Sequence, residues 1–219
     1  NLQSMRELIP STMDRLHELS NKSGGLIGSS TGYKDLDNKL QGLQNGDLIV
    51  VAGRPSMGKT SLAMNVAENV LLDSESNGSV LIFSLEMPGE SLTTRLLSGM
   101  TKLNQQNVRS GMLKDDELRI LFQQSEKLKN LPLWIDDSSI LSPMELRAKA
   151  RRLARTEKDG LSLIVVDYLQ LMQLPLSSEN RVNQISESSR SLKSLAKELN
   201  VPVIALSQLN RAVENRPNK

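Results

Sequence analysis

Short runs of consecutive apolar residues alternate, along most of this chain, with segments in which apolar positions recur every three or four residues. The first pattern is typical of strands buried on both faces, and the second of helices with one buried face. Their alternation predicts an α/β fold built on a mostly parallel sheet with helices on both faces. The expected strands are 47–52, 80–84, 133–136, 161–167 and 201–206. The expected helices are 59–72, 90–100, 115–128 and 181–199. A further helix is expected to begin at Ser142, which opens it with a capping box.

The start of the chain has a different pattern. Residues 1–4 resemble the remnant of a tag and are left out of the fold prediction. Residues 5–20 have the apolar spacing of a helix, which Pro10 is expected to split, with Ser11 capping its second part. Residues 21–30 are rich in glycine and serine and are expected to form a flexible linker. The globular domain is then expected to occupy residues 31–219.

Composition excludes several classes of protein. The chain has 219 residues and a formal net charge of +2, which excludes a broadly basic nucleic-acid coat, so any such site must be local. It has no cysteine, which excludes thiol chemistry, and its single histidine, His17, nearly excludes a Ser-His-Asp triad. Aromatic residues make up only 2%, so the core must be aliphatic, and nucleic acid would be held by its phosphates rather than by base stacking. No apolar run is long enough to span a membrane and no signal peptide is visible, so we expect a cytoplasmic protein.

The segment after the first expected strand reads GRPSMGKT and fits the pattern G-x-x-x-x-G-K-[ST] of a phosphate-binding loop. Glycines let such a loop wrap closely round a polyphosphate, and its N–H groups and the following helix N-terminus attract anions. Lys59 is expected to reach the β and γ phosphates of ATP, and the Thr60 hydroxyl to coordinate Mg²⁺. The expected nucleotide-binding residues are Gly53, Arg54, Pro55, Ser56, Met57, Gly58, Lys59, Thr60 and Ser61.

Three polar residues end or follow other expected strands. Asp167 ends the run LSLIVVD, where a carboxylate fits the second protein ligand of Mg²⁺. Glu86, in SLEM, is suited to accept a proton from an attacking water, and Gln208, in SQLNR, to hydrogen-bond a γ-phosphate. From the residues alone, Glu86 and Gln208 fit ordinary solvent-exposed turns equally well, so both interpretations stay open at this point.

Together the segments GRPSMGKT, SLEM, VVDYLQLM and ALSQLNR, in this order, resemble the hexameric replicative DNA helicases of the DnaB family. The stretches TGYKDLD, IDDSS and RSLKSLAKEL match the same family, so the resemblance covers residues 31–211. It implies a RecA-like P-loop NTPase core, the C-terminal motor domain of such a helicase, preceded by a linker helix. It also implies that Glu86 is the catalytic carboxylate, Asp167 the Walker B acid, and Gln208 the residue that couples the γ-phosphate to a DNA-facing loop.

The resemblance further implies a homo-hexamer that hydrolyses ATP, with Mg²⁺, at subunit interfaces and moves 5′ to 3′ on single-stranded DNA during replication. Primase and a helicase loader are the implied protein partners, and the bacterial cytoplasm near the nucleoid is the implied location. Arg181, in the loop after the fourth strand, and Arg211, in the C-terminal tail, are candidate DNA contacts. The chain stops at Lys219, before the family's second DNA loop and arginine finger, and we therefore expect it to be C-terminally incomplete.

Two alternatives to a helicase motor stay open. One is another RecA-like ring ATPase, of the recombinase or clock type, although SLEM and DYLQLM speak against it. The other is a nucleotide-binding interaction module without turnover, which an incomplete chain would allow. A P-loop small-molecule kinase is less favoured, because no acceptor pocket is indicated. ATP hydrolysis measured with and without single-stranded DNA discriminates among them.

Overall fold

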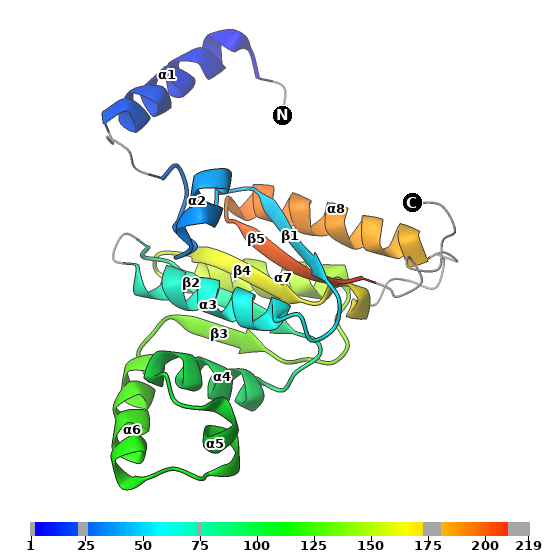
Figure 1. The fold of residues 1–219 in the computed structure, drawn as a ribbon. Coiled ribbons are helices and arrows are strands. Elements are labelled where there is room, and N and C mark those ends of the chain that lie inside the picture. The colour runs from blue at the N-terminus through cyan, green and yellow to red at the C-terminus, as the bar shows by residue number, and fades with distance from the viewer. Residues whose placement is uncertain (1–2, 22–25, 74–75, 173–180, 210–219) are drawn as a thin grey trace, which may run out of the picture.

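A single five-stranded sheet forms the centre of the computed structural model, which describes residues 3–21, 26–73, 76–172 and 181–209. The strands lie in the order β1-β5-β4-β2-β3, and every pair of neighbouring strands is parallel (Figure 1). The predicted parallel α/β fold is therefore confirmed. The strands are β1 (Leu48–Gly53), β2 (Ser79–Ser84), β3 (Leu133–Asp136), β4 (Leu161–Asp167) and β5 (Val203–Gln208).

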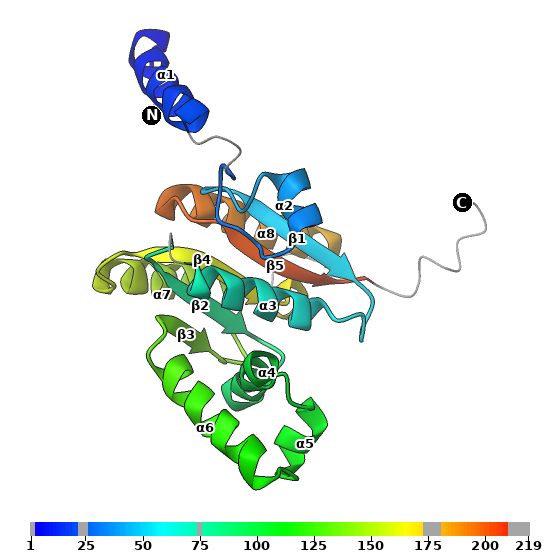
Figure 2. The ribbon, with the colours of Figure 1, turned by 60° about the vertical axis from the view of Figure 1, so that its left-hand side comes forward.

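Helices cover both faces of the sheet, as Figures 1 and 2 show. Helices α3 and α4 pack on one face and α7 and α8 on the other, each pair around its own apolar cluster. The short elements α2, α5 and η1 have no counterpart among the expected ones. The helices are α1 (Met5–Asn21), α2 (Lys34–Leu40), α3 (Lys59–Leu72), α4 (Gly89–Thr101), α5 (Gln105–Ser110), α6 (Asp115–Lys129), α7 (Pro143–Thr156) and α8 (Arg181–Leu199), with the 3₁₀ turn η1 (Leu169–Leu171).

Strand β4 explains why the strand sequences are continuously apolar. Successive side chains of a strand point to opposite faces, so Leu163 and Val165 pack towards α3, whereas Ile164 and Val166 pack towards α7 and α8. All four are fully buried. Among the fully buried apolar side chains of the described residues, Phe83 is the only aromatic one, which confirms the aliphatic core that the composition predicts.

The prediction that Pro10 splits the first helix is wrong, because α1 runs without a break through this residue. Pro10 lacks only the N–H that would bond the carbonyl one turn earlier, and α1 is exposed there, so water can satisfy that carbonyl. Ser11 does not cap a second helix: its hydroxyl donates to the Leu8 carbonyl oxygen at 2.9 Å. None of the described helices is both long and apolar enough to cross a membrane.

The end of the expected flexible linker is bound to the domain. The N–H groups of Ile27 and Gly28 donate to the Gln41 carbonyl, and Ser29 pairs with Leu43 in an isolated antiparallel bridge. A Cβ on Gly28 would come within 2.2 Å of the Leu43 carbonyl oxygen. At this position, glycine therefore serves close backbone packing rather than flexibility.

The buried carboxylate of Asp37, in α2, fixes the chain where it enters the domain. It accepts hydrogen bonds from the Thr31 N–H at 2.8 Å, the Thr31 hydroxyl at 2.7 Å and the Ser30 hydroxyl at 2.7 Å. Burial by itself raises the pKa of Asp37, but these hydrogen bonds outweigh it and bring the pKa below its ordinary value.

We expect Asp37→Ala to lower the free energy of unfolding by about 2–4 kcal/mol at neutral pH, since it leaves the buried Thr31 groups without their charged partner. A folded-state pKa below the unfolded one means that Asp37 stabilises the fold above the unfolded pKa of about 3.9, and that this contribution is lost as pH falls through the folded value. Urea unfolding at several pH values measures both effects. Asp35 is exposed on the same helix, so Asp35→Ala is the control. An equal loss of unfolding free energy in both variants would contradict the prediction, and so would a difference in stability between them that persists at low pH.

Candidate functional site

The carboxyl ends of four parallel strands meet at one edge of the sheet and bring distant residues together. Gly53, at the end of β1, is in register with Gln208 at the end of β5. Ser84, at the end of β2, is in register with Asp167 at the end of β4. Because parallel strands all end at the same edge, the segments that follow them share one crevice, where ligands of such sheets bind.

The phosphate-loop sequence folds into a tight turn between β1 and α3. Gly58 has φ +82°, in the left-handed region, and no atom lies within 4 Å of where its Cβ would be, so the backbone angle rather than crowding requires glycine. Helix α3 begins directly after Gly58 without a side-chain cap, which leaves its first N–H groups available to an anion. The ammonium of Lys59 turns back over the loop and donates to the carbonyl oxygens of Gly53 at 2.8 Å and Arg54 at 2.7 Å.

Thr60 and Asp167, which are 107 positions apart in the chain, form a direct hydrogen bond. The Thr60 hydroxyl donates to Oδ2 of Asp167 at 2.8 Å. Asp167 is 2% exposed; burial raises the pKa of its carboxyl and the nearby Glu86 adds to the effect, while Thr60, Lys59 and Arg95 act in the opposite direction. A hydroxyl and a carboxylate at this separation are the hard oxygen donors that Mg²⁺ prefers, and phosphate and water oxygens commonly complete its shell.

Glu86 lies in a turn that follows β2 and is held at three points. The Leu85 N–H donates to the carbonyl oxygen of Asp167 at 2.7 Å, which ties the turn to the end of β4. The Ser84 hydroxyl donates to the Met87 carbonyl oxygen at 2.6 Å. The Gly89 N–H, at the start of α4, donates to Oδ2 of Asp137 at 2.9 Å. Glu86 itself is exposed, so its carboxylate stands on an ordered turn and faces solvent at the mouth of the crevice.

These segments enclose a cavity of about 460 Å³. Of the residues that the sequence marks as nucleotide-binding, Gly53 and Arg54 contribute carbonyl groups to Lys59 instead of lining the cavity. Met57 is 73% exposed and also lies outside the lining. The lining residues are Pro55, Ser56, Gly58, Lys59, Thr60, Ser61, Glu86, Met87, Arg95, Asp167, Tyr168 and Gln208.

The sequence patterns did not point to Met87, Arg95 or Tyr168, which line the same cavity. Arg95 lies on α4 between the buried residues Leu92 and Leu96, donates to the Ser61 hydroxyl at 3.4 Å, and has a buried Nε without a hydrogen-bond partner among the described residues. A cation at the border of a buried helix face is a weak sequence signal. Only the packing of α4 beside α3 turns Arg95 towards the phosphate loop.

The candidate DNA contacts fall at the limits of the described structure. Arg181 is the first residue of α8, but the placement of its side chain is not described. Arg211 lies outside the described residues, as do residues 173–180 of the loop after η1. Both residues therefore stay predictions.

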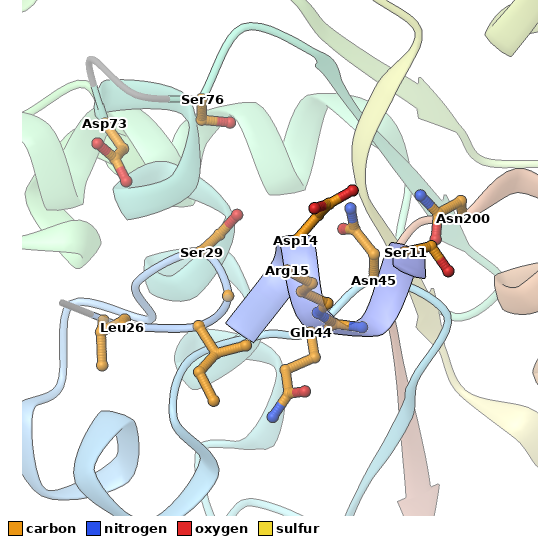
Figure 3. Close-up of a pocket in the computed structure, with 12 residues that line it drawn as sticks. Ser11, Asp14, Arg15, Leu26, Ser29, Gln44, Asn45, Asp73, Ser76 and Asn200 are labelled. Carbon is orange, nitrogen blue, oxygen red and sulfur yellow. The ribbon is translucent and has the colours of Figure 1, made fainter. Parts of the chain in front are cut away.

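A second cavity, of about 660 Å³, lies at the opposite edge of the sheet (Figure 3). Ser11, Asp14 and Arg15 of α1 face segments that precede strands: Gln44 and Asn45 come before β1, and Asn200 before β5. This is the amino edge of a parallel sheet, away from the carboxyl ends where ligands of such sheets bind. The smaller cavity at the phosphate loop is therefore the candidate site.

Comparison with known proteins gives a consistent result. Residues 28–219 match the sequence model of the family described as the DnaB-like helicase C terminal domain. The chain is 48% identical over 219 residues to a protein named replicative DNA helicase DnaB from Buchnera aphidicola subsp. Baizongia pistaciae, covering 99% of this chain and 47% of that protein. The corresponding protein of Pasteurella multocida is 51% identical over 221 residues, with the same two shares. The chain thus spans about half the length of the curated relatives it matches.

Solved structures with this fold include an ATPase domain that matches with a TM-score of 0.88, 30% identity, and coverage of 100% of this chain and 75% of that one. A DnaB-like replicative helicase, described together with its interactions with primase, superimposes with a TM-score of 0.83 and 30% identity over 100% of this chain and 51% of that one. The RecA-like fold expected from the sequence is confirmed by these two matches.

Proposed function

We propose that this chain, which belongs to the family of DnaB-like helicase C-terminal domains, is the ATP-hydrolysing motor of a replicative DNA helicase. The observation that carries the proposal is the convergence of Lys59, Thr60, Glu86, Asp167 and Gln208 on one cavity at the carboxyl edge of the sheet. The two relatives named above are replicative helicases, which favours this function over the recombinase and clock alternatives.

The phosphate loop binds the triphosphate of ATP in this proposal. The ammonium of Lys59 exchanges the carbonyl oxygens of Gly53 and Arg54 for oxygens of the β and γ phosphates, and the first N–H groups of α3 hold the same anion. Thr60 and Asp167 hold Mg²⁺, which neutralises charge on the phosphate oxygens when it is bound. Arg95, which reaches the cavity from α4, adds a second cation to its lining.

Glu86 is the proposed general base. Its exposed carboxylate orients a water molecule and takes a proton from it as the water oxygen forms a bond to the γ-phosphorus and the bond to the β-phosphate bridging oxygen breaks. The products are ADP and inorganic phosphate. The Gln208 carboxamide, at the end of β5, hydrogen-bonds the γ-phosphate before this step and loses that partner after it.

The wider assembly is proposed with the same function. The cavity is open at the carboxyl edge, and Ser56, Gly58 and Glu86 are exposed there, which suits a site that a neighbouring subunit of a homo-hexamer covers. Single-stranded DNA, followed 5′ to 3′, is the proposed track, and Arg181 and Arg211 are the proposed contacts to its phosphates. Primase and a helicase loader are the proposed partners, in the bacterial cytoplasm beside the nucleoid.

Steady-state ATP hydrolysis by the intact protein, with and without single-stranded oligothymidylate, tests this function. We expect the oligonucleotide to stimulate turnover, and we expect the stimulation to weaken as salt is raised, because phosphate contacts release counterions. Turnover that DNA leaves unchanged at low salt would contradict the helicase assignment. Nucleotide binding without any turnover in the intact protein would favour an interaction module instead.

A further inference from the structure

The side chain of Gln170 makes a two-point hydrogen-bond clamp on the backbone of Gln208. Its Oε1 accepts the Gln208 N–H at 3.2 Å, and its Nε2 donates to the Gln208 carbonyl oxygen at 2.9 Å. The same Nε2 also donates to the Ser207 hydroxyl at 2.9 Å. Gln170 lies in η1, three residues after Asp167, so the clamp joins the segment that follows β4 to the last residue of β5.

The sheet leaves this part of the Gln208 backbone without a strand partner. Pairing between β4 and β5 stops at Val166 and Ala205, whereas β1 accompanies β5 as far as Gly53 and Gln208. The Leu209 N–H donates to the Gly53 carbonyl on the β1 side, and backbone groups of successive strand residues point to opposite sides. The N–H and C=O of Gln208 therefore point to the β4 side, beyond the end of β4.

A primary carboxamide offers one acceptor and one donor at the spacing of a backbone N–H and C=O pair. The Gln170 side chain thus continues the ladder by one residue where β4 has left the sheet. Without it, two half-buried backbone groups of Gln208 would lose their partners, which is costly and would let the end of β5 shift.

We infer that Gln170 is a positioning residue that holds Gln208 in place and makes the end of β5 move together with η1. This inference rests on the proposed role of Gln208 at the γ-phosphate. The chain from Asp167 to Gln170 is then a short covalent connection between a proposed magnesium ligand and the side chain that holds Gln208. A displacement of Gln208 on loss of the γ-phosphate would therefore also displace η1.

Gln170→Ala in the intact protein tests the inference. We expect kcat for DNA-stimulated ATP hydrolysis to fall by about ten- to a hundred-fold with little change in KM, because the change misplaces Gln208 and leaves the phosphate loop intact. Hydrogen exchange of residues 203–209 should accelerate at the same time, since the Gln208 N–H loses its acceptor. Gln123→Ala, exposed on α6, is the matched control and should change neither quantity.

A double-mutant comparison separates action through Gln208 from an independent effect. If Gln170 works by holding Gln208, the variant Gln170→Ala/Gln208→Ala should hydrolyse ATP no more slowly than Gln208→Ala alone. A further fall in the double variant, by the factor seen for Gln170→Ala alone, would overturn the inference. Faster exchange of residues 203–209 with an unchanged kcat would overturn it as well.

Gln170→Glu tests whether both hydrogen bonds to Gln208 are needed, because the effect of this variant on kcat should depend on pH. Its ionised carboxylate can accept the Gln208 N–H but cannot donate to the Gln208 carbonyl, whereas the protonated acid has one donor and one acceptor, like the amide. The ratio of variant to wild-type kcat should therefore rise as pH falls from about 7 to about 5, towards the ordinary glutamate pKa of about 4.3. A flat ratio would contradict the inference. The proposed function is tested separately, by the response of wild-type turnover to DNA and by Lys59→Ala, and neither measurement involves Gln170.

Discussion

Lys59→Ala is expected to abolish measurable ATP turnover. The loop would keep its glycines but lose the ammonium group that reaches over it and that now donates to the carbonyl oxygens of Gly53 and Arg54. Removing a preorganised charge that stabilises the transferred phosphoryl group lowers kcat by about 10²- to 10³-fold, and weaker ATP binding lowers kcat/KM further. The measurements are steady-state hydrolysis and calorimetric titration with Mg²⁺-ATP.

Lys34→Ala is the matched control, because this lysine is exposed on α2 and does not line the cavity. It should leave both binding and turnover unchanged. The circular dichroism and thermal unfolding of Lys59→Ala should stay close to those of the wild type, since Lys59 is only half-buried. Full turnover by a folded Lys59→Ala variant would show that the phosphate loop is not where ATP reacts.

Glu86→Gln is expected to separate binding from chemistry. The amide keeps the size of the side chain but accepts no proton from water, so kcat should fall by about 10²- to 10⁴-fold. The Kd for Mg²⁺-ATP should change little, because the phosphate loop, Thr60 and Asp167 are untouched. Removing the charge next to the buried Asp167 should even ease ionisation there, since Glu86 helps to raise the Asp167 pKa. Single-turnover hydrolysis and equilibrium binding measure the two effects.

Glu90→Gln is the control for this change, as an exposed glutamate in the first turn of α4 that lies outside the cavity lining. It should behave like the wild type in both assays. If Glu86→Gln loses ATP affinity in proportion to kcat, the residue binds substrate and another group activates the water. If it keeps full kcat, Glu86 is an ordinary surface residue of the turn.

Elements whose signals are local were predicted well. The strands 133–136 and 161–167 and the helices 59–72 and 181–199 have the predicted bounds. The capping box of Ser142 and Glu145, with Pro143 at the first helical position, is present at the start of α7 as expected. Strand β5 begins two residues later than predicted, because the Val201 N–H still closes α8 and Pro202 has no N–H to offer a ladder.

Features that depend on contacts between residues far apart in the sequence could not be predicted from local patterns. The residue pattern placed Asp167 and Thr60 at the end of a strand and the start of a helix, but the hydrogen bond between them needs the register of the sheet. Arg95 and Gln170 carried no role in the sequence analysis at all. Their positions at the site follow from how α4 packs beside α3 and from how early β4 ends relative to β5.

The sequence by itself therefore determined the class of fold, the phosphate loop and the order of the chemical groups along the chain, because each of these is written in neighbouring residues. Only the tertiary structure decided that β5 lies between β1 and β4, which cavity is the candidate site, and that a side-chain amide completes the sheet at Gln208. The reason is physical: strand order and register are set by packing of both sheet faces at once, and no short window of residues contains that information.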